Sequence, residues 1–455
     1  MCPQKLTASL NRFLKNQQSA QKTTQMGLFQ QTVSLGMKTL RYCRVCSSQA
    51  LTPILSLGNI YVSDFVTDRL ASQAAKYPLE LVLCEPKRGG CGLLQLKHTV
   101  DPSKMYNFYY YHSGTNALMR EALKDITRKA EKLPLRKGDL VLDIGCNDGT
   151  LLRSYGVQGL GLVGFDPAKN LIPEAMVGTT KIINDYFNYE AFAQNYPRRK
   201  AKVITSIAMF YDLEDPNRFV SDIVKCLDKN GLWIIQMSYL PLMLETNAFD
   251  NICHEHLEYY CMTSLQVLLK RHGLRAVDVE LNDVNGGSFR VTVRPEKAKS
   301  PVAGLNRVRR MEDKEKKMRL AGKQIYLRFA ARVNGIRKQV CRLIKAKQKS
   351  GKIIYAYGAS TKGNTLLQYF NLDHRFIRAA AERNPDKFGK KTVGTMIPIV
   401  SEEEARRARP DFFLVLPWHF LSGFLKRETK YLRSGGRFIV PLPRLKVIPP
   451  LRAGK

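Results

Sequence analysis

The densest group of chemically active side chains in the sequence is the segment Cys253-His-Glu-His-Leu-Glu-Tyr-Tyr260. Histidine is the side chain best suited to take up a proton near neutral pH. In an extended segment, His254 and His256 point to one side and Glu255 to the other. The segment therefore predicts a general base that removes a proton from a carbon next to a carbonyl group. A second metal site and packed structural histidines are the alternatives.

A glycine turn follows an apolar strand in the segment Leu140-Val-Leu-Asp-Ile-Gly-Cys-Asn-Asp-Gly-Thr-Leu-Leu152. Gly145 and Gly149 let the backbone turn tightly and approach a ligand at the carboxyl edge of a sheet, where open α/β folds bind nucleotides. Asn147 stands where many nucleotide-binding loops have a central glycine. The segment predicts a nucleotide-type site, and an ordinary turn between strand and helix is the alternative.

Two acids after this loop are placed to hold a nucleoside. Asp166 ends the run Gly161-Leu-Val-Gly-Phe, roughly 20 residues after the loop, where a carboxylate binds ribose hydroxyls. NAD and S-adenosylmethionine can both use that pair. Asp185, after Lys181-Ile-Ile-Asn, suits the adenine amino group. The opening Asp143-x-Gly145 lacks a pyrophosphate fingerprint, which favours the methyl donor.

Four cysteines near the start of the chain have the types and spacing of a zinc site. Cys43 and Cys46 form a C-x-x-C pair, and Cys84 and Cys91 follow. Four thiolates suffice for a closed tetrahedral Zn²⁺ site whose binding energy helps to fold a small lobe. Residues 85–90 separate the later pair instead of the usual two residues, so a looser loop or free thiols are the alternative.

Two further segments can contact a substrate. Tyr106-Asn-Phe-Tyr-Tyr-Tyr-His112 can supply hydroxyls to a developing enolate, or can simply pack with one edge in water. Gly358-Ala-Ser-Thr-Lys-Gly-Asn364 follows an apolar strand and offers backbone N–H groups and one cation to a phosphate. It is not the G-x-x-x-x-G-K-[ST] motif, so ATP hydrolysis is not implied.

These motifs need a scaffold, and the apolar pattern predicts one. From Asp139 onward, apolar runs alternate with amphipathic segments of helix length, which predicts βαβ units and a parallel sheet. A second, smaller α/β unit is predicted after residue 350. The expected strands are Leu140–Ile144, Gly161–Phe165, Lys181–Ile183, Val203–Ile207, Gly231–Met237, Lys352–Tyr357, Phe412–Leu416 and Arg437–Val440.

Residues 300–350 form a different zone, in which apolar residues recur every three or four positions among many lysines and arginines. This spacing predicts one long amphipathic helix with a basic outer face. A solvated helix packed on a neighbouring domain is the plain interpretation. The alternative is nucleic-acid binding through Arg328, Arg332 and Arg337, since a net charge of +34 attracts nucleic acid, anionic membranes or phosphorylated substrates.

Length and composition limit the class of protein. A chain of 455 residues with 44% hydrophobic composition can bury large cores in two or three domains. No uninterrupted apolar stretch approaches the roughly 18 to 20 residues that a membrane span needs, and ten cysteines are too sparse for a disulfide scaffold. We expect a cytoplasmic protein. Residues 1–42 lack acids, which predicts a flexible basic leader, with an organellar transit peptide as the alternative.

Taken in order, these segments resemble the three-domain S-adenosylmethionine-dependent C-methyltransferases, which include the nucleotide-linked deoxysugar 3-C-methyltransferases. The resemblance runs from about Cys43 to Val447. It rests on Cys43-Arg-Val-Cys46, Tyr109-Tyr-Tyr-His-Ser-Gly114, Asp143-Ile-Gly-Cys-Asn-Asp-Gly149, His254-Glu-His256, Asn285-Gly-Gly-Ser288, Tyr357-Gly-Ala-Ser-Thr-Lys-Gly-Asn364 and Leu416-Pro-Trp-His419.

The resemblance implies zinc in the first lobe, the methyl donor in the middle lobe and a nucleotide-linked substrate between the middle and last lobes. It implies that His256 is the leading candidate for the general base, with Glu255 and nearby tyrosines orienting the substrate. This chain has Tyr211 where the sugar enzymes carry a histidine, and Cys253 where they carry a tyrosine. The reaction type therefore carries over more safely than the particular sugar, and N- or O-methylation of another small substrate is a second hypothesis.

The expected fold class is α/β, with a small N-terminal zinc-binding lobe, a central Rossmann-like methyltransferase domain and a smaller C-terminal Rossmann-like domain. The expected divisions are the leader 1–42, the zinc domain 43–105, the methyltransferase domain 106–298, the helical connector 299–352 and the substrate domain 353–455. The predicted catalytic residues are His256, Glu255, His254, Tyr109 and Tyr211. The predicted donor-binding residues are Asp143, Gly145, Asn147, Gly149, Asp166 and Asp185. The predicted substrate-binding residues are Tyr111, Ser360, Thr361, Lys362 and Asn364.

Overall fold

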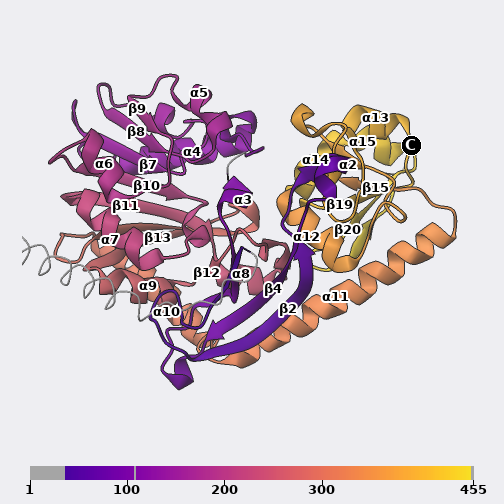
Figure 1. Ribbon diagram of the computed structural model, residues 1–455, viewed down its shortest axis with the longest axis horizontal. Coiled ribbons are helices and arrows are strands. Elements are labelled where there is room, and N and C mark those ends of the chain that lie inside the picture. The colour runs from indigo at the N-terminus through magenta and orange to yellow at the C-terminus, as the bar shows by residue number, and fades with distance from the viewer. Residues whose placement is uncertain (1–35, 107–108, 452–455) are drawn as a thin grey trace, which may run out of the picture.

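The computed structural model describes residues 36–106 and 109–451 of the chain (Figure 1). Of the predicted leader, residues 1–42, the part from 1 to 35 lies outside the described residues. Its last part contains strand β1 (Met37–Thr39), which pairs antiparallel with β6 (His98–Val100). Among the described helices, none combines the length and the apolar character that crossing a membrane requires.

A four-stranded sheet with the order β12-β5-β4-β2 forms the first lobe. Strands β2 (Leu51–Tyr61) and β4 (Lys76–Cys84) form a long antiparallel ribbon that runs below the middle lobe toward the C-terminal lobe (Figure 1). Strand β5 (Leu94–Leu96) pairs with β4. The last strand, β12 (Glu258–Tyr259), comes from the middle of the chain and pairs with β5.

The middle lobe is a seven-stranded sheet with the order β13-β14-β11-β10-β7-β8-β9. Strands β9, β8, β7, β10 and β11 are parallel, and β14 runs antiparallel to both of its neighbours. The order reverses between β7 and β10, and a crevice outside the carboxyl ends of the strands at such a point is where open α/β sheets bind ligands. The bounds are β7 Leu140–Ile144, β8 Gly161–Phe165, β9 Lys181–Ile183, β10 Ala201–Ile207, β11 Leu227–Ser238, β13 Leu274–Asn282 and β14 Ser288–Pro295.

Helices of the middle lobe cover this sheet with their apolar sides. The N-cap side chains Asn116, Asn188 and Asp215 each accept a hydrogen bond from a backbone N–H in the first turn of their helices. Such caps satisfy donors that the helix itself leaves unpaired. The helices are α4 (Ala117–Ala130), α6 (Tyr189–Asn195), α7 (Pro216–Cys226) and α9 (Met262–Arg271).

A six-stranded sheet with the order β18-β16-β15-β19-β20-β21 forms the C-terminal lobe. Strands β18, β16, β15, β19 and β20 are parallel, and β21 is antiparallel. This is the predicted second α/β unit. The bounds are β15 Ile354–Tyr357, β16 Ala380–Glu382, β18 Ile399–Ser401, β19 Phe412–Val415, β20 Arg437–Val440, β21 Lys446–Ile448, α12 Thr361–Phe370, α13 Glu402–Arg407, α14 Leu421–Arg427 and α15 Thr429–Arg433.

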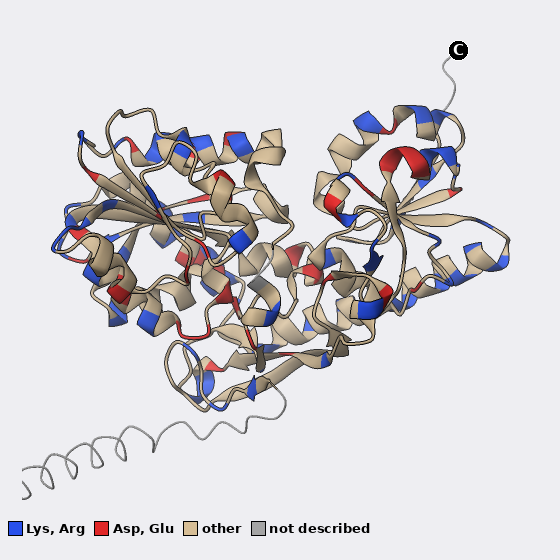
Figure 2. Ribbon diagram, turned by 45° about the horizontal axis from the view of Figure 1, so that its top comes forward, with Lys and Arg blue, Asp and Glu red and all other residues tan. Residues whose placement is uncertain are grey.

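Residues 302–349 form two helices, where the sequence predicted one. Helix α10 (Val302–Lys317) ends before Arg319, whose φ is +58°, and α11 (Lys323–Lys349) begins after Gly322. A left-handed residue cannot continue a right-handed helix, so the chain breaks at Arg319. Figure 2 shows basic residues along α11.

Two of the arginines predicted as nucleic-acid ligands make contacts within the chain. The side chain of Arg332 donates to Asn247 Oδ1 and to the Leu244 carbonyl, both at 2.7 Å. The guanidinium carbon of Arg337 lies 4.8 Å from the centre of the Tyr369 ring. These contacts favour the packing interpretation of the helix.

The first lobe also holds the C-terminal lobe. The side chain of Gln368 accepts from Tyr61 N at 2.7 Å and donates to Tyr61 O at 3.2 Å. Strand β3 (Phe65–Val66) pairs antiparallel with β17 (Lys391–Thr392). The end of the β2–β4 ribbon therefore belongs to the surroundings of α12.

Glu315 is a buried carboxylate that joins α10 to the start of α9. It is 1% exposed, and its Oε1 accepts from the Tyr239 hydroxyl at 2.8 Å and from Met262 N at 2.6 Å. Its Oε2 accepts from Thr263 N at 2.8 Å and from the Thr263 hydroxyl at 2.6 Å. The carboxylate thus takes the place of a cap for α9.

We expect Glu315→Ala to lower the free energy of unfolding by about 3 kcal/mol, because it leaves buried donors without an acceptor. The control is Asp313→Ala on the same helix, which removes an exposed ion pair with Lys316 and should cost less than about 0.5 kcal/mol. Chemical denaturation followed by circular dichroism measures both values. Equal midpoints for the two variants would refute the capping role.

Candidate active site and zinc site

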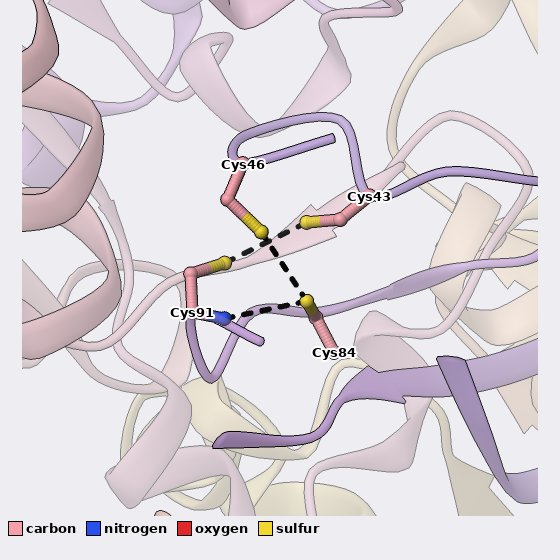
Figure 3. A group of neighbouring side chains, drawn as sticks. All are labelled: Cys43, Cys46, Cys84 and Cys91. Carbon is pink, nitrogen blue, oxygen red and sulfur yellow. Dashed lines mark hydrogen bonds between the residues drawn. The ribbon is translucent and has the colours of Figure 1, made fainter. Parts of the chain in front are cut away.

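Four cysteine side chains, two before β2 and two at and after the end of β4, converge (Figure 3). Their sulfur atoms all lie within 4.8 Å of one another. Cys43 Sγ is 3.6 Å from Cys91 Sγ, and Cys46 Sγ is 3.5 Å from Cys84 Sγ. A tetrahedral site with Zn–S bonds of about 2.3 Å has sulfur atoms about 3.8 Å apart. The donor set and its spacing therefore fit a structural zinc ion.

The long interval between Cys84 and Cys91 is a tight loop and not a loose one. The segment Pro86–Arg88 forms a single 3₁₀ turn, and Gly90 N and Gly92 N then donate back to Glu85 O and Cys84 O. A Cβ at Gly90 would lie 2.6 Å from the backbone of Cys84, so only glycine fits there. Cys91 N donates to Cys84 Sγ at 3.3 Å.

The grouped thiols change one another's protonation. Hydrogen bonds from the thiols of Cys84 and Cys91 lower the pKa of Cys43 to about 2. The same hydrogen bond with Cys43 raises the pKa of Cys84 to about 12. A cluster that already holds one thiolate is prepared to bind a cation, since the thiolate is the form that ligates metal.

The glycine loop lies at the switch point of the middle sheet. Gly145 has φ +72°, and a Cβ there would lie 3.1 Å from Met209 Cγ, so the loop needs glycine for its conformation and for space. Asp143 is buried at the end of β7, and its Oδ1 accepts from the Thr205 hydroxyl at 2.6 Å. Burial raises the pKa of Asp143 to about 7.

The predicted donor-binding acids follow neighbouring strands. Asp166 comes directly after β8, and its two carboxylate oxygens accept from Asn147 N at 2.8 Å and Ala168 N at 2.9 Å. Each oxygen keeps a further acceptor position for a ligand hydroxyl. Asp185 follows β9 and is exposed. Acceptors at the carboxyl ends of adjacent strands fit the nucleoside half of S-adenosylmethionine.

The segment Tyr109–Gly114 lies across this loop. Asn147 contributes both side-chain atoms, because its Nδ2 donates to Tyr111 O at 2.9 Å and its Oδ1 accepts from Ser113 N at 2.9 Å. Asp148 Oδ2 accepts from Gly114 N at 2.6 Å. Asn147 stands in place of the usual central glycine and has φ +51°. Its two side-chain hydrogen bonds fix the segment Tyr109–Gly114 across the loop.

Two tyrosines of this segment were predicted to face substrate, and each leaves part of its side chain exposed while the protein desolvates its phenol group. Tyr109 exposes 40% of its surface and Tyr111 42%. Desolvation, followed by the charges of Asp212 and Glu255, raises the pKa of Tyr109 well above its usual value. Burial and Asp148 raise the pKa of Tyr111 to about 12. Both phenols are therefore protonated donors at neutral pH.

The His-Glu-His segment is a turn and not the extended chain assumed from the sequence. His254 and His256 consequently have different surroundings. His256 is half-buried, and its Nδ1 is 2.8 Å from the carbonyl oxygen of Asn251. Its ring centre lies 4.4 Å from that of Tyr211, which follows β10. His256 and Tyr211 line one cavity with Asn251 and Tyr259.

His254 faces the first lobe. It is 3% exposed, and its Nε2 lies 3.2 Å from the Tyr77 carbonyl of β4. Burial lowers its pKa to about 4. These contacts favour a structural role for His254, while its catalytic assignment stays a prediction.

Acidic groups near His256 include two that sequence reasoning missed, Asp212 and Glu258. Burial, then the neighbouring Glu255, raises the pKa of Asp212 well above its usual value, and burial does the same for Glu258. Burial raises the pKa of Glu255 to about 7. Glu258 lines the cavity beside His256 and has an Oε1 without a hydrogen-bond partner. The position of Glu258 two residues after His256, within the segment Cys253–Tyr260, was the signal that could have indicated it.

The glycine loop of the C-terminal lobe places its polar residues in several roles. Ser360 caps α12 by accepting from Gly363 N at 3.0 Å. The backbone oxygen of Thr361 accepts from Ser63, and Asn364 Nδ2 donates to Asp64 O at 2.9 Å, so both contact the first lobe. Lys362 Nζ donates to Asn251 Oδ1 at 2.6 Å and reaches the middle lobe. Their substrate-binding role stays a prediction.

Comparison with known proteins decides the family. A relative from Streptomyces niveus, C-methyltransferase NovU, is 32% identical over 410 residues, which covers 89% of this chain and 96% of the relative. The chain belongs to the three-domain C-methyltransferases. Family models match as "C-methyltransferase C-terminal domain" over residues 283–443, "Methyltransferase domain" over 115–279 and "Putative zinc binding domain" over 43–106.

Solved structures resemble only part of the C-methyltransferase. Magnesium protoporphyrin IX methyltransferase (ChlM) from Synechocystis PCC 6803 with bound SAH is 14% identical and covers 41% of this chain and 90% of that chain, with a TM-score of 0.31. N-methyltransferase NodS from Bradyrhizobium japonicum WM9 is 15% identical and covers 40% and 99%, with a TM-score of 0.31. Likenesses this weak carry no argument about the acceptor.

The C-methyltransferase uses S-adenosylmethionine and zinc as cofactors, as the sequence predicted. Cys43, Cys46, Cys84 and Cys91 would hold zinc. Asp143, Asp166 and Asp185, with the loop from Gly145 to Gly149, would hold the methyl donor, and their individual roles stay predictions.

We expect Cys84→Ser to abolish the binding of a zinc ion and to lower the free energy of unfolding by more than about 2 kcal/mol, because structural zinc contributes its binding energy to folding. The control is Cys341→Ser on α11, whose sulfur lies 3.0 Å from Phe370 O, and which should retain zinc. Elemental analysis and thermal unfolding measure both effects. Full zinc content in Cys84→Ser would contradict the four-cysteine site.

We expect Asp166→Asn to weaken the binding of S-adenosylhomocysteine roughly 10- to 100-fold, since hydrogen bonds to a charged acceptor contribute about 1.5–3 kcal/mol. Asp139→Asn, just before the opposite end of β7, is the control and should bind normally, because its carboxylate accepts from the nearby Arg136 N. Isothermal titration calorimetry gives both dissociation constants. An unchanged constant in Asp166→Asn would remove this acid from the donor site.

Proposed function

We propose that this enzyme methylates a carbon next to a carbonyl group in a nucleotide-activated keto sugar, with His256 as the general base. The geometry of His256 is the observation that supports this function best. Its Nδ1 faces a backbone carbonyl, which can only accept a hydrogen bond, so Nδ1 carries the proton. The lone pair of Nε2 is then free to accept a proton from substrate.

His256 is neutral at working pH, as a general base must be. Burial, then the charge of Lys362, lowers its pKa to about 3. In the proposed reaction, Nε2 accepts the proton of the substrate carbon, and the electron pair stays on the carbon that receives the methyl group. S-adenosylmethionine, when bound, supplies an electrophilic methyl group.

Neutral hydroxyl and carboxyl groups near His256 suit the other half of this step, which places negative charge on the carbonyl oxygen. Desolvation, before the effect of Asp212, raises the pKa of Tyr211 and of Tyr109 well above the usual value, so both remain donors. Glu255, with a pKa raised to about 7 by burial, is partly protonated near neutral pH. Preorganised donors of this kind stabilise a developing oxyanion.

The nucleotide part of the substrate is proposed to lie between the middle and C-terminal lobes. Lys362 supports this placement, because it stands in the first turn of α12 and extends its ammonium group to the middle lobe. A helix N-terminus together with a lysine suits a phosphate. N- or O-methylation of another acceptor is the alternative, and the structure of the product distinguishes it.

We expect His256→Gln to lower kcat by about 10²- to 10⁴-fold, the usual contribution of a general base. Binding of S-adenosylhomocysteine should be unchanged, because His256 lies outside the glycine loop. The control is His272→Gln in the same lobe, whose Nε2 contacts Asn217 at 3.1 Å. Rates with keto-sugar nucleotides and NMR of the product give the result. A normal rate in His256→Gln, or a methyl group on N or O, would refute the proposal.

A further inference from the structure

The turn that precedes the His-Glu-His segment is where the C-terminal lobe docks. Asn247 Nδ2 donates to Pro443 O at 2.9 Å, and the Phe249 ring lies 5.5 Å from Tyr369 of α12. Trp418 Nε1 donates to Asp250 Oδ2 at 3.0 Å. The next residue is Asn251, so the docked surface continues directly into the residue that holds His256.

Asn251 connects two groups that come from different lobes. Its side-chain oxygen accepts from Lys362 Nζ at 2.6 Å, and its backbone oxygen lies 2.8 Å from His256 Nδ1. Asn251 itself is 4% exposed, so both contacts are shielded from water. A second contact fixes the lysine, because Nζ also lies 3.5 Å from the Asn285 carbonyl. Lys362 and His256 are therefore joined through one buried residue.

The groups around His256 leave Lys362 as its main charged neighbour. The pKa values of the tyrosines and carboxyl groups that face it are raised by burial, which keeps the phenols neutral and favours the neutral form of the acids. After burial, the charge of Lys362 is the next cause that lowers the pKa of the imidazole. Tyr211, from the turn after β10, and Glu258 and Tyr259, from β12, line the same cavity as His256. Asp212 follows Tyr211, Glu255 precedes His256 in the turn, and Lys362 of α12 binds the same Asn251.

We infer that Lys362 is a positioning residue that, through Asn251, holds His256 in its proton-accepting tautomer, and that a diphosphate bound at Lys362 makes His256 a stronger base. The inference rests on the proposed function, because it assigns the proton transfer to His256. An anion beside the ammonium group cancels its charge, and a cancelled charge no longer opposes protonation of the imidazole. His256 would therefore be a stronger base only while the substrate is bound.

Imidazole NMR of the whole protein labelled with ¹⁵N-histidine tests this inference without turnover. The chain has seven histidines, and His256→Gln identifies the signals of His256. In the wild-type protein we expect His256 to be protonated at Nδ1 alone and to stay neutral at every pH at which the protein is folded. Millimolar inorganic pyrophosphate should shift its titration to higher pH, because the anion cancels the charge of Lys362 while the effect of burial remains.

Lys362→Met removes the charge and the hydrogen bond to Asn251. In this variant we expect His256 to titrate at higher pH without pyrophosphate and to show a share of the Nε2–H tautomer. Addition of pyrophosphate should no longer change its signals. Lys352→Met is the matched control, because Lys352 pairs with Asp411 at the surface of the same lobe at 3.0 Å. It should match the wild-type protein in every spectrum.

A wild-type His256 that ignores pyrophosphate overturns the coupling, whether or not Lys362→Met folds. A Lys362→Met protein with the wild-type tautomer and titration overturns the positioning role. Failure of the proposed function is recognised separately, because His256→Gln would then keep its turnover whatever the spectra show. Loss of turnover in His256→Gln together with unmoved spectra would refute this inference alone.

Discussion

The structure depends on one short hydrogen-bonded junction, the addition of β12 to the sheet of the first lobe. Glu258 and Tyr259 pair with Gln95 and Leu94, and Leu96 N donates to Leu257 O at 2.9 Å. This junction lies two residues after His256. A slip of one residue in this pairing would displace both cavity-lining residues of β12, Glu258 and Tyr259. The register of β12 therefore determines what surrounds His256.

The four-cysteine cluster is connected to this junction through a short chain of contacts. β5 begins three residues after Cys91. The backbone N–H of Cys84 donates to Leu93 O at 2.9 Å, directly before β5. A metal that holds Cys84 and Cys91 together therefore fixes the start of β5, and β5 fixes β12. On the other side, Lys362 and Trp418 hold Asn251 and Asp250. Each flank of the candidate base is thus supported by a different lobe.

The sequence predicted the elements well where local pattern decides the structure. Buried parallel strands are short apolar runs, so the bounds of Leu140–Ile144 and Gly161–Phe165 agree with the structure. It failed where distant contacts decide. The helix break at Arg319 comes four residues after Glu315, whose carboxylate binds Tyr239 and the start of α9. His254 lies in a turn in which its ring contacts the Tyr77 carbonyl of the first lobe. Lys362 and Asn251 are separated by 111 positions, and no spacing rule relates them.

The outer surface of the enzyme and its candidate active site differ in the kind of charged groups that they carry. Lysines and arginines are spread along the described part of the chain (Figure 2), and water and salt screen those that are exposed. Near His256 the protein instead gathers acids, and burial raises the pKa values of Asp212 and Glu258 well above their usual range, which favours the neutral forms. In such a poorly solvated region one fixed cation has a large effect, because its field is weakly screened. The single ammonium group of Lys362 can therefore influence His256 more than the many cations of the surface.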